Sequence, residues 1–189
     1  MRMRYFGDSY DIVKRFLPHT IDPEGSWAAF PMFTDSDSQR IAAGYEAFLG
    51  VRVIRSDTIQ VDTVRREHFE ISPHEHRLFV DPNTGIRMGP PTKAKSSPDY
   101  VFSEELIRLC VAEPQRLVVV FDQSHPRGAE RESLRRKLEA FQHQGLHGFA
   151  YSSHAGFVVL SAPEQVLTAA RNRLTLSGLP GERIVVVQP

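Results

Sequence analysis

Short apolar runs along this chain alternate with longer stretches in which apolar residues recur at the spacing of a helix. Such alternation is typical of an α/β domain, in which helices cover a sheet of buried strands. Strands are predicted at residues 4–6, 27–33, 51–54, 78–80, 116–121, 148–151, 157–160 and 184–187. Helices are predicted at 10–17, from Asp35 or Ser36 to Gly50, and at 103–112, 130–142 and 161–178. The chain therefore predicts mainly βα units, followed by a hairpin, a helix and a last strand.

The order of these elements predicts one α/β domain over residues 1–189, with three layers and a mixed, mainly parallel sheet. Five consecutive apolar residues from Leu117 indicate a strand buried on both faces, as in the centre of a parallel sheet. The segment 148–160 predicts a C-terminal hairpin. The proline-rich stretch at about 87–99 predicts a long loop, and such a loop is more often functional or mobile than a plain connection.

Composition narrows the class of protein. An apolar content of 41%, with 23 basic and 23 acidic residues, argues against a disordered chain. The single cysteine, Cys110, excludes a disulfide within one chain and a multi-cysteine zinc site, and its apolar surroundings predict a core position. No apolar run approaches the roughly 18 residues that cross a bilayer. Because the first residues are also too polar for a signal peptide, we expect a cytoplasmic protein without a membrane partner.

Polar residues follow five of the predicted strands at the point where each strand ends. The clusters are Gly7-Asp8-Ser9, Thr34-Asp35, Asp81–Gly85, Asp122–His125 and Ser152–His154. In open α/β sheets, ligands bind beyond the carboxyl ends of the strands, because loops and helix N-termini converge there. The clusters therefore predict one shared functional rim. Alternatively, each cluster is an ordinary helix cap or turn.

Asp81 is the most specific of these candidates, because an apolar strand leads directly into the turn Asp81-Pro-Asn-Thr84-Gly85. A carboxylate at a rigid strand end suits a metal ligand or a general base. The alternative is a turn that the aspartate side chain stabilises. In the functional interpretation, Thr84 and Gly85 contact the substrate.

The segment after the strand at 116–121 is the second candidate. Asp122, Gln123, His125 and Arg127 bring a carboxylate, an amide, an imidazole and a guanidinium together within six residues. Gln123 and Arg127 are expected to hold a phosphate near the start of the next helix, and His125 is expected to move protons. The alternative is a capping loop with a surface arginine.

Asp8, Asp35, Asp81 and Asp122 are predicted to converge on the rim. Carboxylates gathered in this way repel one another unless a cation or a proton intervenes. Hard divalent ions such as Mg²⁺ or Mn²⁺ take oxygen ligands and commonly activate water against a phosphodiester. We therefore expect metal binding by Asp8, Asp81 and Asp122, with Asp81 and Asp122 also catalytic. His154, which follows a strand, is a second candidate for proton transfer.

Basic residues provide a further clue. Six of the basic residues lie in the predicted long loop or in and just before the predicted helix at 130–142: Lys93, Lys95, Arg127, Arg131, Arg135 and Arg136. Beside an acidic pocket they would hold a polyanion, whereas the alternative is a solvated helix face.

The nucleophile-elbow, P-loop and G-x-G-x-x-G patterns are all missing. The sequence thus predicts a divalent-metal-dependent phosphodiester hydrolase acting on nucleic acid or nucleotide. The alternatives are a degenerate methyltransferase-like or nucleotide-binding domain, and a binding module without catalysis.

Two resemblances accompany this interpretation. The opening Tyr5-Phe-Gly-Asp-Ser-Tyr10, together with Asp81-Pro-Asn-Thr-Gly85 and Gln123-Ser-His-Pro-Arg127, resembles an uncharacterised bacterial α/β family to which no activity is attached. Asp81-Pro82 and the predicted hairpin also resemble class I methyltransferase folds. That resemblance implies a site for S-adenosylmethionine. The glycine-rich turn that holds this cofactor is replaced by Gly7-Asp-Ser-Tyr10, which argues against methyl transfer.

Overall fold

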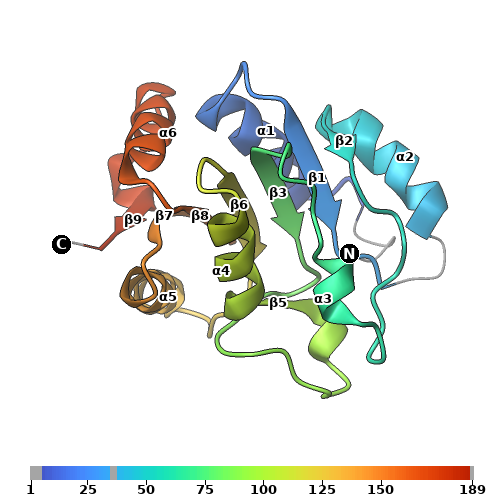
Figure 1. The fold of residues 1–189 in the computed structure, drawn as a ribbon. Helices are drawn as coiled ribbons and strands as arrows, with labels where there is room; N and C mark the ends of the chain where they lie inside the picture. The colour runs from blue at the N-terminus through green and yellow to red at the C-terminus, as the bar shows by residue number, and fades with distance from the viewer. Residues whose placement is uncertain (1–5, 35–37, 188–189) are drawn as a thin grey trace.

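The protein is built around a seven-stranded mixed sheet (Figure 1). The computed structural model of the chain describes residues 6–34 and 38–187. The strands, in spatial order, are β2 (Arg52–Val53), β1 (Trp27–Pro31), β3 (Arg77–Asp81), β6 (Leu117–Asp122), β8 (Gly156–Ser161), β7 (His147–Ser152) and β9 (Ile184–Val186). The predicted α/β class with a mixed sheet is confirmed.

The first four strands of this order are parallel, and the last three make antiparallel pairs. β1 pairs in parallel with β2 and β3, and β3 pairs in parallel with β6. β7 and β8 form the predicted hairpin, and β8 lies between β6 and β7. β9 lies at the edge, antiparallel to β7. All residues of β6 are buried, as the apolar run from Leu117 predicts.

Helices cover both faces of the sheet and give the predicted three layers. One layer contains α1 (Ser9–Ile21), α2 (Ser38–Leu49) and α6 (Glu164–Leu176), and the other contains α3 (Arg65–His68), α4 (Ser103–Ala112) and α5 (Glu130–His143). Alternate side chains along each strand face opposite layers, because successive residues of a strand point to opposite sides. Thus Phe79 and Val119 pack in the core under α1, whereas Leu78 and Val118 pack in the core under α4.

The predicted end of the first helix at Pro18 is wrong. Helix α1 continues through Pro18 to Ile21. Proline removes one donor from a helix, yet Leu17 and Ile21 are fully buried and hold this last turn against the core. The strand predicted at 4–6 falls almost entirely outside the described residues, as do Asp35 and Ser36.

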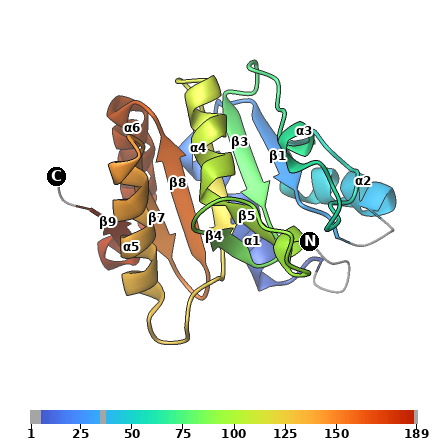
Figure 2. The same ribbon diagram turned by 60° about the horizontal axis from the view of Figure 1, so that its bottom comes forward.

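A second, two-stranded parallel sheet is not anticipated by the sequence. It consists of β4 (Gly85–Arg87) and β5 (Tyr100–Phe102), which pair in register. Figure 2 shows it at the carboxyl end of the main parallel strands. A short 3₁₀ helix, Ser97–Asp99, precedes β5, and another, Gly181–Arg183, precedes β9. The long loop predicted at 87–99 therefore has regular structure at both ends: its first residue belongs to β4, and its last three residues form the 3₁₀ helix.

The single cysteine of the chain lies in the core. Cys110 is fully buried on α4, as predicted, and burial raises the pKa of its thiol to about 12. A thiol with so high a pKa stays protonated and is a poor nucleophile.

Among the described residues, no helix has both the length and the apolar character required to span a bilayer.

His68 gives the fold a predictable dependence on pH. It is 3% exposed and packs against the ring of Phe30, with 5.4 Å between centroids. Burial lowers the pKa of His68 from its ordinary value of 6.5, and Asp57 opposes only part of this effect. The folded chain therefore keeps this imidazole neutral at a pH where the unfolded chain protonates it.

We expect the free energy of unfolding to fall as the pH drops below about 6.5, because the unfolded chain then binds a proton at His68. This contribution stops growing once the pH is below the pKa of His68 in the folded protein. His68→Phe should remove this component. Urea unfolding of both proteins between about pH 5 and about pH 8 measures it as the difference between two stability profiles. Parallel profiles would contradict the assignment.

Candidate functional site

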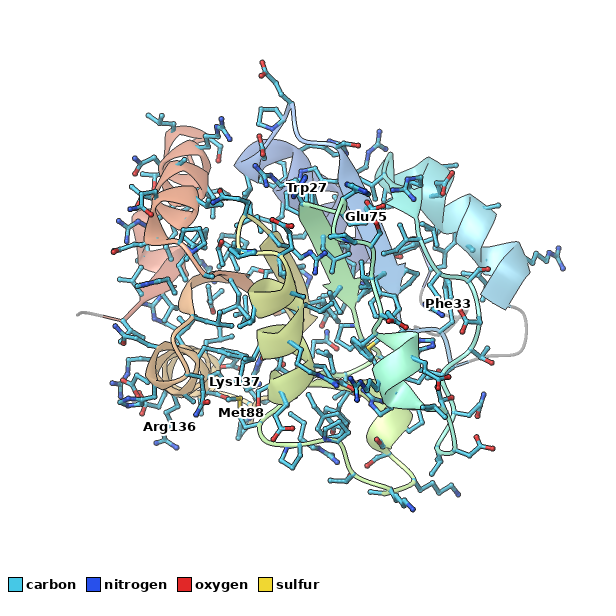
Figure 3. All side chains as sticks on the ribbon, in the orientation of Figure 1. Trp27, Phe33, Glu75, Met88, Arg136 and Lys137 are labelled. Atoms are coloured by element: carbon cyan, nitrogen blue, oxygen red, sulfur yellow. The ribbon has the colours of Figure 1, made fainter. Side chains whose placement is uncertain are left out.

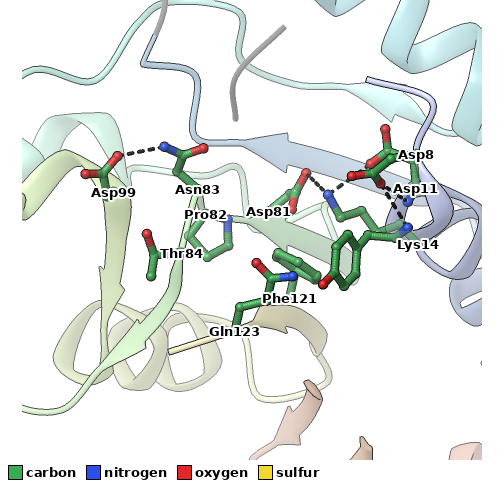
Figure 4. A pocket seen from close by; sticks show the side chains of 11 residues that line it. Asp8, Asp11, Lys14, Asp81, Pro82, Asn83, Thr84, Asp99, Phe121 and Gln123 are labelled. Atoms are coloured by element: carbon green, nitrogen blue, oxygen red, sulfur yellow. Dashed lines mark hydrogen bonds and ion pairs between the residues drawn. The ribbon is translucent and has the colours of Figure 1, made fainter. Parts of the chain in front are cut away.

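A cavity of about 370 Å³ lies at the carboxyl edge of the parallel strands (Figure 4). The start of α1 contributes Asp8, Tyr10, Asp11 and Lys14. The turn after β3 contributes Asp81, Pro82, Asn83 and Thr84, the end of β6 contributes Phe121 and Gln123, and Asp99 comes from the segment before β5. The cavity therefore occupies the edge of the sheet at which the sequence predicts a functional rim.

The floor of the cavity is a buried cluster of charges. Lys14 Nζ lies 3.0 Å from Asp11 Oδ1 and 3.1 Å from Asp81 Oδ2. The hydroxyl of Tyr45, from α2, donates a hydrogen bond of 2.6 Å to the same Asp81 oxygen. Lys14 Nζ also lies 4.3 Å from the centre of the Phe121 ring. This floor is thus built from two helices of one layer, α1 and α2, and from the ends of two strands, β3 and β6.

Burial by itself would lower the pKa of Lys14, but Asp81 and Asp11 outweigh burial and raise it. Burial also raises the pKa of Tyr45 well above its ordinary value, and the neighbouring Asp81 carboxylate adds to this effect. The lysine therefore stays protonated and the tyrosine stays neutral. Neither group is available as a base or as an amine nucleophile.

Two carboxylate oxygens in the cavity accept no hydrogen bond from the described residues. Asp8 caps α1, and its Oδ1 accepts from the backbone N–H groups of Tyr10 and Asp11, at 2.9 and 3.2 Å. No such bond reaches Oδ2 of Asp8 within the described part of the chain. Asp81 is 1% exposed, and its Oδ1 is buried without a partner there. A buried unpaired carboxylate oxygen is costly and calls for a cation or a donor.

Hydrogen bonds of side chains and backbone fix the cavity wall that lies across from α1. The Asn83 side chain donates to Asp99 Oδ1 at 2.7 Å, and the Thr84 N–H donates to the Asp99 carbonyl at 2.8 Å. The Gln123 N–H donates to the Thr84 carbonyl at 2.8 Å. These contacts place the Thr84 hydroxyl and the Gln123 amide on the wall across from α1 (Figure 4).

Asp122 lies outside this cavity, and the structure does not bring it together with Asp8 and Asp81. Its carboxylate is fully buried and accepts from Lys137 Nζ at 2.6 Å, from the Ile86 N–H at 3.1 Å and from the Ser124 hydroxyl at 2.6 Å. Figure 3 shows that Lys137 and the exposed Arg136 are neighbours on α5. These hydrogen bonds occupy both oxygens of the Asp122 carboxylate and connect the small sheet to α5. We therefore assign Asp122 no metal or catalytic role.

The other predicted site residues are also dispersed. Gly85 adopts φ +141° and packs against Asp122 instead of lining the cavity. His125 and Arg127 do not line it either: His125 has a buried Nδ1 without a partner among the described residues, and Arg127 is exposed. His154 is exposed and does not line the cavity, but its ring lies over that of Tyr10, which does, with centroids 4.3 Å apart.

Known proteins offer no guide to this site. Comparison with protein-family models, with curated proteins and with solved structures returned no match. Function must therefore be argued from the cavity itself.

The sequence interpretation overlooks three residues at the floor. Asp11 and Lys14 are three apart on α1, and Tyr45 comes from α2. One signal is visible in the sequence: Tyr10, Lys14 and Leu17 share a face of the first helix, so Lys14 occupies a position that faces the core. A lysine at such a position usually has a carboxylate partner.

The described residues contain no group of three or more His, Cys, Asp or Glu side chains arranged to hold a metal ion. A metal cage made entirely of protein ligands is therefore not present in that part of the chain. Mg²⁺, however, is often bound through only one or two carboxylates, and water and substrate phosphate complete its coordination. Asp8 and Asp81 both line the cavity, and each has one carboxylate oxygen without a partner among the described residues, which is the donor chemistry of that kind of site.

Proposed function

We propose that the cavity is the active site of a phosphodiester hydrolase that acts on nucleic acid or nucleotide with the help of Mg²⁺ or Mn²⁺. The observation that carries this proposal is the Asp81 carboxylate. One of its oxygens accepts hydrogen bonds from Lys14 and Tyr45, and the other is buried without a partner among the described residues. Such a group is suited to binding a hard cation.

The charge of the cavity supports a cation as part of the substrate complex. Four aspartates and one lysine line it among the described residues. A phosphate ester entering this space alone would meet net negative charge, which disfavours binding. A divalent ion bound to the phosphate reverses that balance. The carboxylates and the phosphate oxygens would be its oxygen ligands.

Each residue has a role in this proposal. Asp8 and Asp81 would hold the cation, and the bound ion would supply activation of water and neutralisation of charge on the phosphate. Lys14 stays protonated, fixes the positions of Asp11 and Asp81, and adds positive potential beneath the reacting phosphate. The Thr84 hydroxyl and the Gln123 amide orient the phosphate oxygens.

The proton for the leaving oxygen comes from the mouth of the cavity. His154 is an exposed imidazole whose ring lies over Tyr10, a residue that lines the cavity. Its Nε2 is 3.5 Å from the Ser9 hydroxyl. Imidazole is the usual side chain for proton transfer near neutral pH.

Removing the carboxylates tests the proposal directly. Asp8→Asn and Asp81→Asn should each lower kcat/KM for an aryl phosphodiester or a short oligonucleotide by about 100-fold, because the cation loses a ligand. The assay is run with Mn²⁺ and again with a chelator, which should abolish cleavage. Asp62→Asn, an exposed aspartate outside the cavity, is the matched control and should retain full activity.

Titration of the apoprotein with Mn²⁺, followed by electron paramagnetic resonance, provides a measurement that does not depend on turnover. Wild type and Asp62→Asn should bind the ion, and Asp8→Asn should bind it at least tenfold more weakly. Circular dichroism confirms that each variant is folded. Chelator-resistant cleavage, or equal activity of Asp8→Asn and wild type, would refute the proposal.

A second candidate is a nucleotide-binding domain without catalysis. It is favoured by Lys14, which already occupies the space between Asp11 and Asp81, and by the stacked rings of Tyr10 and His154 beside them. A nucleoside would then raise the melting temperature without added metal. S-adenosylmethionine fits less well, because the chain after β1 continues through the fully buried Met32 and Phe33 instead of a glycine-rich turn.

A further inference from the structure

We infer that the substrate of this site is single-stranded nucleic acid, and that its backbone runs across the segment 85–98 beside the cavity. This inference rests on the proposed function, since it names the substrate class of the same site. Segment 85–98 includes β4 and the loop that follows it. Its charge, its attachment to the cavity and its aromatic neighbour each support the inference.

The charge of this segment differs from that of the whole chain. The chain has 23 basic and 23 acidic residues, whereas residues 85–98 include Arg87, Lys93 and Lys95 and no aspartate or glutamate. Lys93 and Lys95 are exposed. Exposed lysines beside a site for phosphate chemistry are suited to contact a nucleic-acid backbone.

Both ends of the segment are attached to the wall of the cavity. It begins directly after Thr84 and ends before Asp99, and these two cavity residues are joined by a backbone hydrogen bond of 2.8 Å. Farther along, the Gly89 N–H donates to the Ser103 hydroxyl at 2.9 Å. Figure 2 shows the loop between β4 and β5 at the edge of the sheet that carries the cavity. A strand bound by this loop is therefore led toward the aspartates.

The segment also has a platform for a base. The Arg87 guanidinium lies 3.9 Å from the centre of the Tyr100 ring, and both side chains are partly exposed. Tyr100 pairs with Gly85 in the small sheet and directly follows Asp99, which lines the cavity. Bases of single strands stack on such aromatic and guanidinium planes without strong sequence preference.

The depth of the cavity favours a single strand over a duplex. The reacting groups lie at its floor, where Lys14 is 6% exposed and Asp81 is 1% exposed. A stiff double helix cannot bend one phosphate into this space, whereas a single strand can turn its backbone inward. The substrate therefore has to present one flexible strand.

Binding to a fluorescently labelled single-stranded oligonucleotide, measured by anisotropy without divalent metal, tests the inference separately from cleavage. Lys93→Gln/Lys95→Gln should weaken binding at least about tenfold at low salt, and should lower the slope of log K against log salt by about 1.4, for two lost phosphate contacts. Tyr100→Leu should weaken binding about fivefold or more through lost stacking.

The matched control is Arg40→Gln/Arg171→Gln, which removes the same charge from exposed positions on α2 and α6. It should bind the strand as wild type does. Unchanged affinity of the lysine double variant, or tighter binding of a duplex of equal length, would overturn the inference. Unchanged cleavage by Asp8→Asn would instead overturn the proposed hydrolase activity, so the two failures are distinguishable.

Discussion

Replacing Lys14 with methionine is expected to lower the free energy of unfolding by about 3–5 kcal/mol. The ammonium is the shared partner of Asp11 and Asp81, and each of these carboxylates is 1% exposed. Methionine has a similar length and fills the same space. The loss of stability therefore comes mainly from the carboxylates of Asp11 and Asp81, which stay buried without their positive partner. Urea unfolding near neutral pH, followed by circular dichroism, measures the change.

Two controls separate charge from packing. Asp81→Asn in the Lys14→Met background should recover part of the lost stability, because it removes one of the stranded charges. The penalty for Lys14→Met should also shrink as the pH is lowered, because the unpaired carboxylates become neutral by protonation. A penalty below about 1 kcal/mol would indicate that water reaches these carboxylates when the lysine is absent.

Gly85→Ala should be the most disruptive single-methyl change near the site, with a cost of about 3 kcal/mol or more. Gly85 has φ +141°, and an added Cβ would lie 2.1 Å from Asp122 Oδ1 and 3.0 Å from the Gln123 backbone nitrogen. Relief would require moving the backbone of β6 or breaking the Asp122–Lys137 pair. Thermal and urea unfolding provide the measurement.

Gly89→Ala is the matched comparison for this prediction. Gly89 also has a positive φ, +95°, but an added Cβ there meets nothing within 4 Å. Its substitution should therefore cost only about 1 kcal/mol, from backbone strain alone. Equal losses for the two variants would contradict the close packing between Gly85 and Asp122.

Patterns that extend over a whole element predicted the fold well. The apolar run at β6 indicated burial on both faces, and the segments at β7 and β8 indicated a hairpin. The small sheet escaped prediction because β4 and β5 have three residues each, too few to display a period. The extension of α1 past Pro18 escaped because the core contacts of Ile21 outweigh one lost helix hydrogen bond.

The candidate site was predicted in part, and strand alternation explains the difference. Asp81 follows Val80 and shares the face of Phe79, which lies in the core under α1. Asp122 follows Phe121, which belongs to that same core, and so Asp122 points to the opposite layer. The alternation of side chains along each strand therefore places Asp81 and Asp122 on opposite faces of the sheet. The partnership of Lys14 with Asp81 spans 67 positions, and no local pattern reveals it.

The two buried lysine–aspartate pairs lie on opposite faces of the sheet at its carboxyl edge. Lys14 attaches α1 to the end of β3, and Lys137 attaches α5 to the end of β6. Separating either helix from this edge requires breaking a desolvated ion pair. Local opening motions should therefore concentrate in the loop between β4 and β5, while the floor of the cavity stays rigid.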